Sequence, residues 1–414
     1  MFIRCSDSGC PTVLDIHDRL LQCPRCGDLL EVGMELQGLD VEWLRRTWLQ
    51  RRSSQEALDR SGIWRFREFL PQLYRPDRVV TLEEGNVPLL PAPRSAAYGG
   101  LRRLWFKHLG WNPTGSFKDA GMTVAVTHAR YLGARQVVCA STGNTAASMA
   151  AYAARAGIPG RVYLPQGAIS MAKLAQTLDY GAEIVQVEGN FDAALEQLLR
   201  SAGEDIYFLN SINPFRIEGQ KIIMMGLMEQ LDWNPPDFIV LPGGNLGNAS
   251  AFGKALQEMH ATALIAKVPR IVIVQAKGAN PLVRTWQSGS DKLEPIANPQ
   301  TAASAICIGA PRSWKKALRV LRFTNGLCLD VTEEEIAEAK AVIGAEGIGC
   351  EPASATTLAG IRKLVNGKIV DSDANVVAIL TGHALKDTEY IIRAHQDRLS
   401  SLVTAAQSRA VSSA

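Results

Sequence analysis

The chain has 414 residues and a formal net charge of +3, with 44 Lys and Arg against 41 Asp and Glu. This balance, without a block of basic residues, argues against a surface for nucleic acid. Hydrophobic residues make up 47% of the chain, enough to bury large cores, and the length predicts two or three domains. No apolar run approaches the roughly 20 residues that cross a bilayer, and the N-terminus lacks the apolar segment of a signal peptide, so we expect a cytoplasmic protein without membrane contact.

Four of the eight cysteines crowd the N-terminus. Cys5 and Cys10 form one pair, and Cys23 and Cys26 form a second pair with the usual Cys-x2-Cys spacing. Paired thiolates on tight turns can supply four ligands to a tetrahedral zinc ion, which would hold together a segment too short for a core of its own. Reduced thiols without metal are the alternative. The other four cysteines stand in apolar surroundings and are predicted to be buried, reduced thiols: Cys139, Cys307, Cys328 and Cys350.

The next segment is predicted to be structural. Residues 40–75 form a charged helical region whose Trp and Phe side chains fall on apolar spacings and serve packing. Nothing in this region calls for a ligand. Residues 82–89 then form a loop punctuated by glycine and proline.

A single lysine follows a strong turn signal at residues 112–119. Pro113 fixes φ, and Gly115 permits a backbone conformation that other residues resist. Lys118 comes directly after this turn, at the start of a predicted helix of small and apolar residues. Burial at that point would disfavour the ammonium form and make the amine a nucleophile towards an aldehyde. A solvated lysine after a turn is the alternative.

After Lys118, apolar strands and helices alternate. Strands are predicted at residues 136–140, 161–164, 183–187, 207–210, 238–241, 270–276 and 376–380. Helices are predicted at 146–156, 333–343 and 353–365, and also from Ser170, Phe191, Glu218 and after Asn248. This alternation is typical of parallel sheets with helices on both faces, an α/β fold. Residues 404–414 are expected to be a frayed tail.

Two turns in this series have the character of anion sites. Residues 141–145, Ser-Thr-Gly-Asn-Thr, link a strand to a helix, where backbone N–H groups and the helix dipole suit a carboxylate. Simple helix capping is the alternative. Residues 242–248 contain three glycines between a strand and a helix, which lets consecutive N–H groups converge on a phosphate. Their spacing matches neither a dinucleotide fingerprint nor a P-loop.

Two further residues have a candidate binding role. Arg216, flanked by Asn210 and Ser211, is a good donor set for a phosphate dianion, although a surface ion pair is the alternative. Thr381 ends a buried strand, where its hydroxyl can donate a hydrogen bond to a ligand or cap a helix.

Several of these stretches resemble the threonine synthases, pyridoxal-phosphate enzymes of the tryptophan-synthase-β fold, and most closely their plant-type branch. The likeness is carried by residues 107–123, by the run 210–221 (Asn-Ser-x-Asn-x-x-Arg-x-Glu-Gly-Gln-Lys), and by residues 170–173 and 303–309. Many relatives also begin with a Cys-rich hairpin. Its role there is structural, and we expect the same here, because the cysteines lie some ninety residues before Lys118.

The resemblance implies two doubly wound α/β domains of fold type II, with the coenzyme between them. The expected organisation is a zinc-ribbon-like segment at 1–38, a large coenzyme-binding domain at 39–124 and 226–402, a small domain at 125–225, and a flexible tail at 403–414. The implied reaction is O-phospho-L-homoserine plus water giving L-threonine and phosphate. The partner would thus be a small phosphorylated amino acid, and a homodimer is expected.

The resemblance also assigns roles to individual residues. Pyridoxal 5′-phosphate would bind Lys118 through an imine, Asn144 at its ring hydroxyl, Thr381 at its pyridine nitrogen, and Gly243, Gly244, Asn245, Leu246 and Gly247 at its phosphate. Lys118 would then act as the general base. The substrate carboxylate would bind Ser141, Thr142, Gly143 and Thr145, and the substrate phosphate would bind Asn210, Ser211 and Arg216.

Two residues depart from the family pattern, and three alternative functions stay open. Val87 stands where relatives often have threonine, and Leu109 stands where bacterial members often have an acidic residue. A serine or threonine dehydratase would use the same coenzyme residues but leave Arg216 idle. A cysteate-synthase-like enzyme would act on phosphoserine and sulfite. A silent binding relative would not need Lys118.

Overall fold

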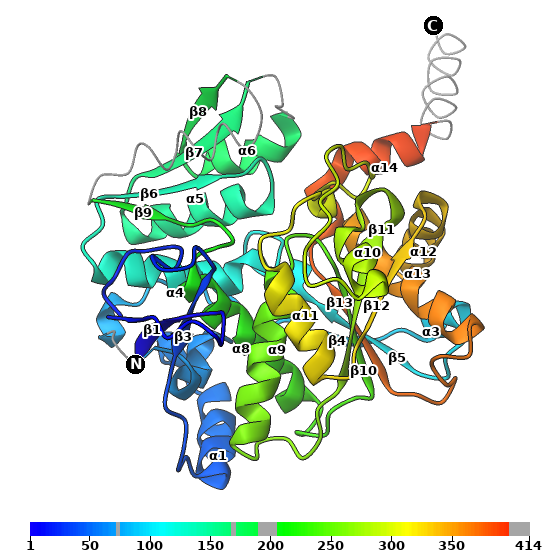
Figure 1. The fold of residues 1–414 in the computed structure, drawn as a ribbon, viewed down its shortest axis with the longest axis horizontal. Coiled ribbons are helices and arrows are strands. Elements are labelled where there is room, and N and C mark those ends of the chain that lie inside the picture. Colours follow the sequence, from blue (N-terminus) through cyan, green and yellow to red (C-terminus); the bar gives the residue numbers. More distant parts are fainter. Residues whose placement is uncertain (72–74, 167–170, 189–204, 397–414) are drawn as a thin grey trace, which may run out of the picture.

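The structure is a computed structural model that describes residues 1–71, 75–166, 171–188 and 205–396. Three predicted features lie outside the described residues: the helix from Phe191, the starting residue Ser170 of another helix, and the tail at 404–414. The described part forms two sheets wrapped by helices and a small N-terminal sheet (Figure 1). This arrangement confirms the predicted α/β class.

The larger sheet has six strands. In spatial order they are β12 (Leu327–Val331), β11 (Arg270–Ala276), β10 (Phe238–Pro242), β13 (Val376–Leu380), β5 (Leu104–His108) and β4 (Leu89–Pro91). The first five run parallel, and β4 pairs antiparallel with β5 at the edge.

The central strands of this sheet are buried on both faces. Every residue of β10 and β13 is buried. In β10, Ile239 and Leu241 belong to one core, and Phe238 and Val240 belong to another. Because successive side chains of a strand point to opposite faces, one core lies on each face of the sheet. Helices cover the two cores: α9 (Gly247–Ala261) and α11 (Trp314–Phe323) the first, and α3 (Pro93–Gly99), α12 (Glu333–Ala345) and α13 (Pro352–Asn366) the second.

The smaller sheet has four parallel strands. Their order is β8 (Glu183–Val187), β7 (Gly160–Pro165), β6 (Gln136–Ala140) and β9 (Ile206–Phe208). Helices α4 (Lys118–Tyr131), α5 (Asn144–Ala156) and α6 (Met171–Asp179) accompany it (Figure 1). All four strands fall within residues 125–225, the predicted small domain, whose bounds stay a prediction.

Helix α8 (Pro214–Gln230) packs against both α4 and α9, and lies between the two sheets (Figure 1). Nearly all of its residues are buried, as expected for a helix covered on every side. Helices α4 and α8 approach closely because Gly219 has no side chain, and a Cβ there would collide with the backbone oxygen of Ala120. The first turns of these two helices carry Lys118 and Arg216, so this contact fixes the lysine relative to the arginine.

The N-terminal segment forms a small antiparallel sheet in the order β2 (Val13–Leu14), β1 (Phe2–Cys5) and β3 (Leu30–Gly33). The helical region predicted at 40–75 is broken into α1 (Val41–Arg52), α2 (Ala57–Arg60) and a 3-10 helix (Trp64–Phe69). Trp48 is fully buried there, as the packing role predicts, whereas Trp43 is about half exposed.

Most predicted elements have the expected position, but one helix begins earlier than predicted and two strands of the large sheet were not predicted. The helix predicted from Glu218 begins earlier, at Pro214, because the Asn213 side chain caps it and Pro214 suits its first position. Strands β5 and β12 were not predicted. Lys107 and Asp330 interrupt their apolar patterns, although both strands pair in the large sheet. The remaining helices of this part of the chain are α10 (Pro281–Ser288) and α14 (Thr388–Ala394), with short 3-10 turns between elements.

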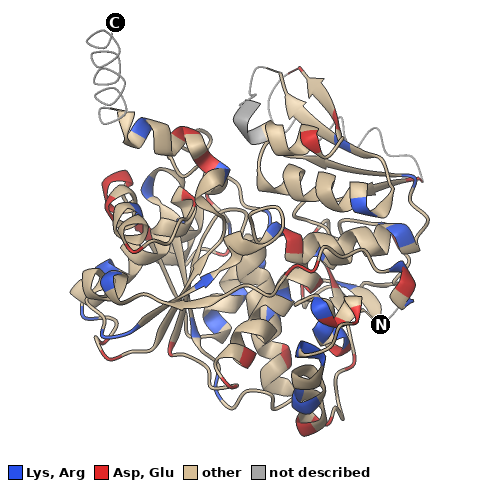
Figure 2. Ribbon diagram, turned by 180° about the vertical axis from the view of Figure 1, so that it is seen from behind, with Lys and Arg blue, Asp and Glu red and all other residues tan. Residues whose placement is uncertain are grey.

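Acidic and basic residues are interspersed along the ribbon (Figure 2), as the small net charge suggests. Among the described helices, none combines the length and apolar character that a membrane span requires.

Candidate active site

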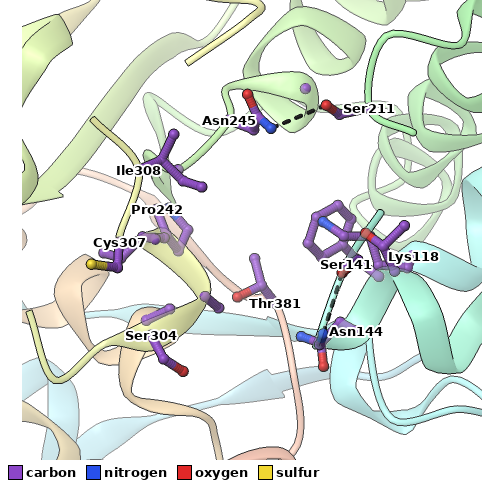
Figure 3. A pocket seen from close by; sticks show the side chains of 18 of the residues that line it. Lys118, Ser141, Asn144, Ser211, Pro242, Asn245, Ser304, Cys307, Ile308 and Thr381 are labelled. Carbon is purple, nitrogen blue, oxygen red and sulfur yellow. Dashed lines mark hydrogen bonds between the residues drawn. The ribbon is translucent and has the colours of Figure 1, made fainter. Parts of the chain in front are cut away.

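A cavity of about 1210 Å³ opens at the carboxyl ends of strands from both sheets. Ala140, Pro242 and Thr381, which end or directly follow β6, β10 and β13, all line it. Open α/β sheets bind ligands at this edge, because the loops and helix N-termini meet there. Figure 3 shows Lys118, Ser141 and Asn144 on one side of this cavity and Pro242, Cys307 and Ile308 on the other.

Lys118 lines the cavity from the first residue of α4 (Figure 3). Its amine nitrogen lies 3.7 Å from the centroid of the Phe117 ring. Burial, with the charge of Arg216 acting in the same direction, lowers the pKa of Lys118 to about 7, while Glu351 opposes the shift. A substantial fraction of this amine is therefore neutral near pH 7, as a nucleophile requires.

Asp119 holds the turn that precedes Lys118. Its buried carboxylate accepts hydrogen bonds from the Thr114 N–H at 2.7 Å and from the hydroxyls of Thr114 and Ser148, each at 2.6 Å. Burial raises the pKa of Asp119 to about 6. Gly115 has φ of 82°, the left-handed conformation that the turn signal predicts.

Of the helices that begin in the cavity lining, α4, α5, α9 and α13 have no side-chain cap, and α5 and α9 each follow a strand through a polar or glycine-rich turn. Helix α5 begins after Gly143 and α9 begins after Leu246, and neither side chain accepts a hydrogen bond from its helix. Uncapped N–H groups and the positive end of the helix dipole attract anions. Helix α8 differs, since Asn213 accepts from the N–H groups of Phe215 and Arg216. The cavity therefore has two backbone sites suited to anions.

The loop before α9 has a backbone that a ligand can approach closely. Leu246 has φ of 65°, a left-handed conformation that costs a non-glycine residue roughly 1 kcal/mol and turns successive amides towards one point. A Cβ at Gly244 would come within 3.2 Å of the Ala305 oxygen, so only glycine fits without movement. Residues 244–247 line the cavity, as predicted for a phosphate loop. Gly243 does not, because it faces Ile273 of the next strand.

Arg216 is a buried cation without a carboxylate partner. Its side chain is 1% exposed, and its Nη1 donates to the Leu209 oxygen at 3.1 Å. Its Nε has no hydrogen-bond partner, and in the described part of the chain no acidic side chain forms an ion pair with it. Burial lowers the pKa of Arg216 to about 10. A buried guanidinium without a counter-ion is costly, and its fork of donors is free to bind an anion.

Asn210 and Ser211 lie beside this arginine in the cavity lining, and their side chains have partners of their own. The Asn210 side-chain N–H donates to the Ala140 oxygen at 3.1 Å, and its Oδ1 accepts from the Ala140 N–H at 3.2 Å. The Ser211 hydroxyl accepts from Asn245 at 3.0 Å (Figure 3). Asn245 thereby connects the predicted phosphate loop to the residues predicted to bind a substrate phosphate.

Thr381 and Asn144 converge on one residue that the sequence did not predict, Glu351. Thr381 donates to Glu351 Oε1 at 2.7 Å, and Asn144 donates to Glu351 Oε2 at 2.9 Å. The Ser354 hydroxyl accepts from the Thr381 backbone N–H at 2.8 Å. All three of Thr381, Asn144 and Glu351 line the cavity.

A family model described as pyridoxal-phosphate dependent enzyme matches residues 80–382. A threonine synthase of Methanocaldococcus jannaschii is 42% identical over 401 residues, which cover 96% of each chain. A threonine synthase of Mycobacterium leprae is 46% identical over 317 residues, 76% of this chain and 85% of the relative. This chain belongs to the threonine synthase family of pyridoxal-phosphate-dependent enzymes.

Solved structures show the same fold at low identity. Maize serine racemase has a TM-score of 0.64 and 21% identity, over 76% of this chain and 93% of that one. The processed form of threonine deaminase isoform 2 from Solanum lycopersicum has a TM-score of 0.64 and 19% identity, over 89% and 97%. At these identities the likeness concerns the fold, which is type II of the pyridoxal-phosphate enzymes.

The cavity of this threonine synthase family member fits pyridoxal phosphate. Lys118 offers a partly neutral amine, and α9 offers an uncapped N-terminus behind a tight glycine loop. Two buried acceptors in the lining, Gln220 Oε1 and Asn248 Oδ1, have no hydrogen-bond partner among the described residues. Unpartnered buried polar atoms are rare in native proteins, and here they mark room for a polar ligand.

Several polar lining residues were not predicted: Gln22, Gln176, Arg312, Glu351 and Lys386. Glu351 precedes Pro352 at the start of α13, a local pattern that signals a helix start and not a cavity. Lys386 donates to the Thr114 oxygen at 3.1 Å and to Gln176 at 2.5 Å. Such contacts between distant segments leave no trace in local sequence.

The two departures from the family pattern lie outside the cavity lining. Val87 is 3% exposed and Leu109 is fully buried, so both serve the core. The Val87 backbone oxygen accepts from Lys107 at 2.9 Å. The substitution at position 87 therefore removes no group from the described wall of the cavity.

The four N-terminal cysteines come together at one point. Their sulfur atoms all lie within 4.8 Å of one another, with 3.4 Å between Cys5 and Cys26 and 3.7 Å between Cys10 and Cys23. Four sulfurs around a tetrahedral zinc ion would be about 3.8 Å apart, from Zn–S bonds of about 2.3 Å. The cluster has the ligands and dimensions of a structural zinc site.

One residue of the Cys-rich segment also reaches the cavity, while the structural role expected of the segment stays a prediction. Gln22, next to Cys23, lines the cavity, and its amide donates to the Gly27 oxygen at 3.0 Å. Strand β3 is held by Lys254 of α9, which donates to the Val32 oxygen at 2.6 Å. The segment comes near the cavity because it folds back against α8 (Figure 1).

Proposed function

We propose that this protein converts O-phospho-L-homoserine and water to L-threonine and phosphate. The observation that carries the substrate assignment is the buried guanidinium of Arg216, which has a free Nε and no acidic partner among the described residues. A phosphate dianion is the ligand that best compensates such a group, because it accepts two parallel hydrogen bonds from the guanidinium fork. The same cavity contains Lys118.

Two different groups of residues would bind the two ends of the substrate. The uncapped start of α5, with Ser141, Thr142, Gly143 and Thr145, would hold the α-carboxylate. Arg216 and Ser211 would hold the substrate phosphate, with Asn210 fixing the loop through Ala140. This placement would present the Cα and Cβ protons to the Lys118 amine.

Pyridoxal phosphate, when bound, would supply a ring that accepts the electron pair left at Cα. Asn144 would bind its ring hydroxyl, Thr381 its pyridine nitrogen, and residues 244–247 its phosphate. Lys118 would hold the coenzyme and then remove and return protons at Cα and Cβ, which its pKa of about 7 suits. Phosphate would leave from Cγ and water would add at Cβ.

Product analysis with three substrates separates the proposal from its alternatives. We expect O-phosphohomoserine to release threonine and phosphate in equal amounts. Release of 2-oxobutyrate from threonine as the main activity would favour a dehydratase. Turnover of phosphoserine with sulfite, at a higher kcat/KM than O-phosphohomoserine, would favour a cysteate-synthase-like enzyme.

We further propose that Cys5, Cys10, Cys23 and Cys26 bind one structural zinc ion. The sulfur spacing supports this assignment, as does the small size of the sheet, whose strands have only four, two and four residues. Metal analysis of the purified protein should give one zinc per chain, and replacing two of the cysteines by serine should abolish it.

The assembly and location that we propose are a cytoplasmic homodimer with a large domain at 39–124 and 226–402 and a small domain at 125–225. Sedimentation of the purified protein tests the dimer.

A further inference from the structure

Glu351 is a buried carboxylate whose side chain serves the cavity. It is 3% exposed and precedes α13, yet its side chain accepts no hydrogen bond from that helix. Its backbone N–H donates to the Gly382 oxygen at 3.0 Å, which fixes its position beside the end of β13. A Cβ at Gly382 would come within 2.5 Å of the Glu351 carboxyl carbon. The absence of a side chain at 382 thus makes room for this carboxylate.

Thr381 has its only hydroxyl proton committed to Glu351. The hydroxyl donates to Oε1 at 2.7 Å, and a carboxylate can only accept. The Ser354 hydroxyl lies 3.0 Å from the Thr381 hydroxyl oxygen. The Thr381 oxygen can therefore offer only a lone pair to a further neighbour, and a ring nitrogen bound there must bring its own proton.

The carboxylate also lacks a cationic partner. Within the described residues, no Lys, Arg or His forms an ion pair with Glu351. The titratable groups around it are Lys118 of α4, Lys386 after β13, and Cys350 and His383, which pair beside it. A buried carboxylate without a counter-ion is costly, and a protonated ring nitrogen would supply the missing positive charge.

We propose that Glu351, acting through the Thr381 hydroxyl, is the counter-ion that keeps the pyridine nitrogen of the bound coenzyme protonated. The inference rests on the proposed contact between Thr381 and that nitrogen. Glu351 is a positioning residue, because it acts through the threonine. A protonated ring accepts the electron pair at Cα more readily than a neutral ring does. With this carboxylate behind the threonine, the ring nitrogen would be more firmly protonated than with the threonine alone.

Glu351 also orients Asn144, the second side chain proposed to bind the coenzyme ring. Asn144 donates one amide hydrogen to Glu351 Oε2 at 2.9 Å and keeps the other for a further acceptor. The proposed acceptor is the ring hydroxyl oxygen. Glu351 therefore orients the two side chains that would hold the ring at its nitrogen and at its hydroxyl group.

The test measures the protonation state of the ring nitrogen directly. Holoenzyme is prepared with coenzyme labelled with nitrogen-15 in the ring, and the chemical shift is recorded for the native protein and for Glu351→Gln. The shift of a protonated pyridine is expected in the native protein. Glutamine can donate an N–H to Thr381, which frees the threonine proton for the ring nitrogen, so the shift of a neutral pyridine is expected in the variant.

Kinetics provide a second readout. By analogy with other outer-shell carboxylates, Glu351→Gln should lower kcat roughly 10- to 100-fold, with a much smaller change in KM. Glu346→Gln is the matched control, because Glu346 also accepts from neighbouring N–H and O–H groups but lies outside the cavity lining. That variant should keep the native shift and native kcat.

A neutral ring nitrogen in the native holoenzyme would overturn the inference, and so would a variant with an unchanged shift. The native measurement decides the matter even if Glu351→Gln fails to fold or to hold the coenzyme. Product analysis of the same native sample separates the two proposals. Absence of threonine formation would refute the proposed function, whereas threonine formation with a neutral ring would refute only the role of Glu351.

Discussion

Replacing Arg216 by methionine should change activity and stability in opposite directions. The Nη1 group already bonds the Leu209 oxygen, and a substrate phosphate can accept from about two of the four N–H donors that remain. A hydrogen bond to a charged group contributes roughly 1.5–3 kcal/mol, and two such bonds contribute about 3–6 kcal/mol. Their loss corresponds to a decrease in kcat/KM of roughly 10²- to 10⁴-fold.

The stability effect follows from the burial of the same group. Burial lowers its pKa to about 10, which corresponds to roughly 3 kcal/mol of unfavourable free energy for the charged form. Methionine removes that cost and loses the bond to Leu209, worth about 1 kcal/mol. We therefore expect the free energy of unfolding of the coenzyme-free protein to rise by about 2 kcal/mol.

Urea unfolding and a phosphate-release assay measure the two effects. Arg65→Met is the matched control, because Arg65 is equally buried but pairs with Glu229 at 2.8 Å. Breaking that pair should destabilise the protein by about 3–5 kcal/mol, and it should leave the KM for the phosphorylated substrate near its native value. If Arg216→Met retains native kcat/KM, or destabilises the protein as much as the control does, the reasoning about an unpaired anion-binding cation is wrong.

Three further predictions concern other parts of the molecule. Lys118 has a pKa of about 7, so the rate of coenzyme uptake by the coenzyme-free protein should rise through pH 7 and then level off; a rate that keeps rising towards pH 10 would contradict this. In α8, Gly219→Ala should destabilise the protein strongly, because its Cβ would collide with the Ala120 oxygen. Gly226→Ala, which meets nothing within 4 Å, should instead stabilise it by about 0.5–1 kcal/mol in urea unfolding, and equal effects at the two sites would refute the packing argument. Cys23→Ser should abolish zinc binding and lower the unfolding midpoint, whereas Cys307→Ser, outside the cysteine cluster, should do neither.

The sequence was most informative where local pattern and local structure coincide. The apolar runs of β10 and β13 predicted buried parallel strands, and both strands lie at the centre of the large sheet. The Asn-Pro-Thr-Gly turn placed Lys118 at a helix start, and the structure has it there. The glycine loop likewise predicted residues 244–247 in the cavity lining.

The sequence could not predict contacts between residues that are distant along the chain. Glu351 is followed by Pro352 in a common helix-start pattern, and nothing local indicates that its carboxylate meets Thr381, thirty residues on. Gln22 belongs to a segment that was assigned away from the active site because of its distance along the chain. Gly243 belongs to the glycine loop but packs on Ile273, and only the three-dimensional register of β10 and β11 separates it from Gly244.

The most direct test of the whole account is to reduce the coenzyme-loaded protein with borohydride and to locate the modified residue by mass spectrometry. The account predicts a single stable adduct on Lys118. Lys107 and Lys386 are internal comparisons, since burial also lowers the pKa of Lys107 to about 7 outside the cavity lining, and Lys386 lines the cavity with two hydrogen bonds of its own. An adduct on either of these lysines, or none on Lys118, would contradict the central claim.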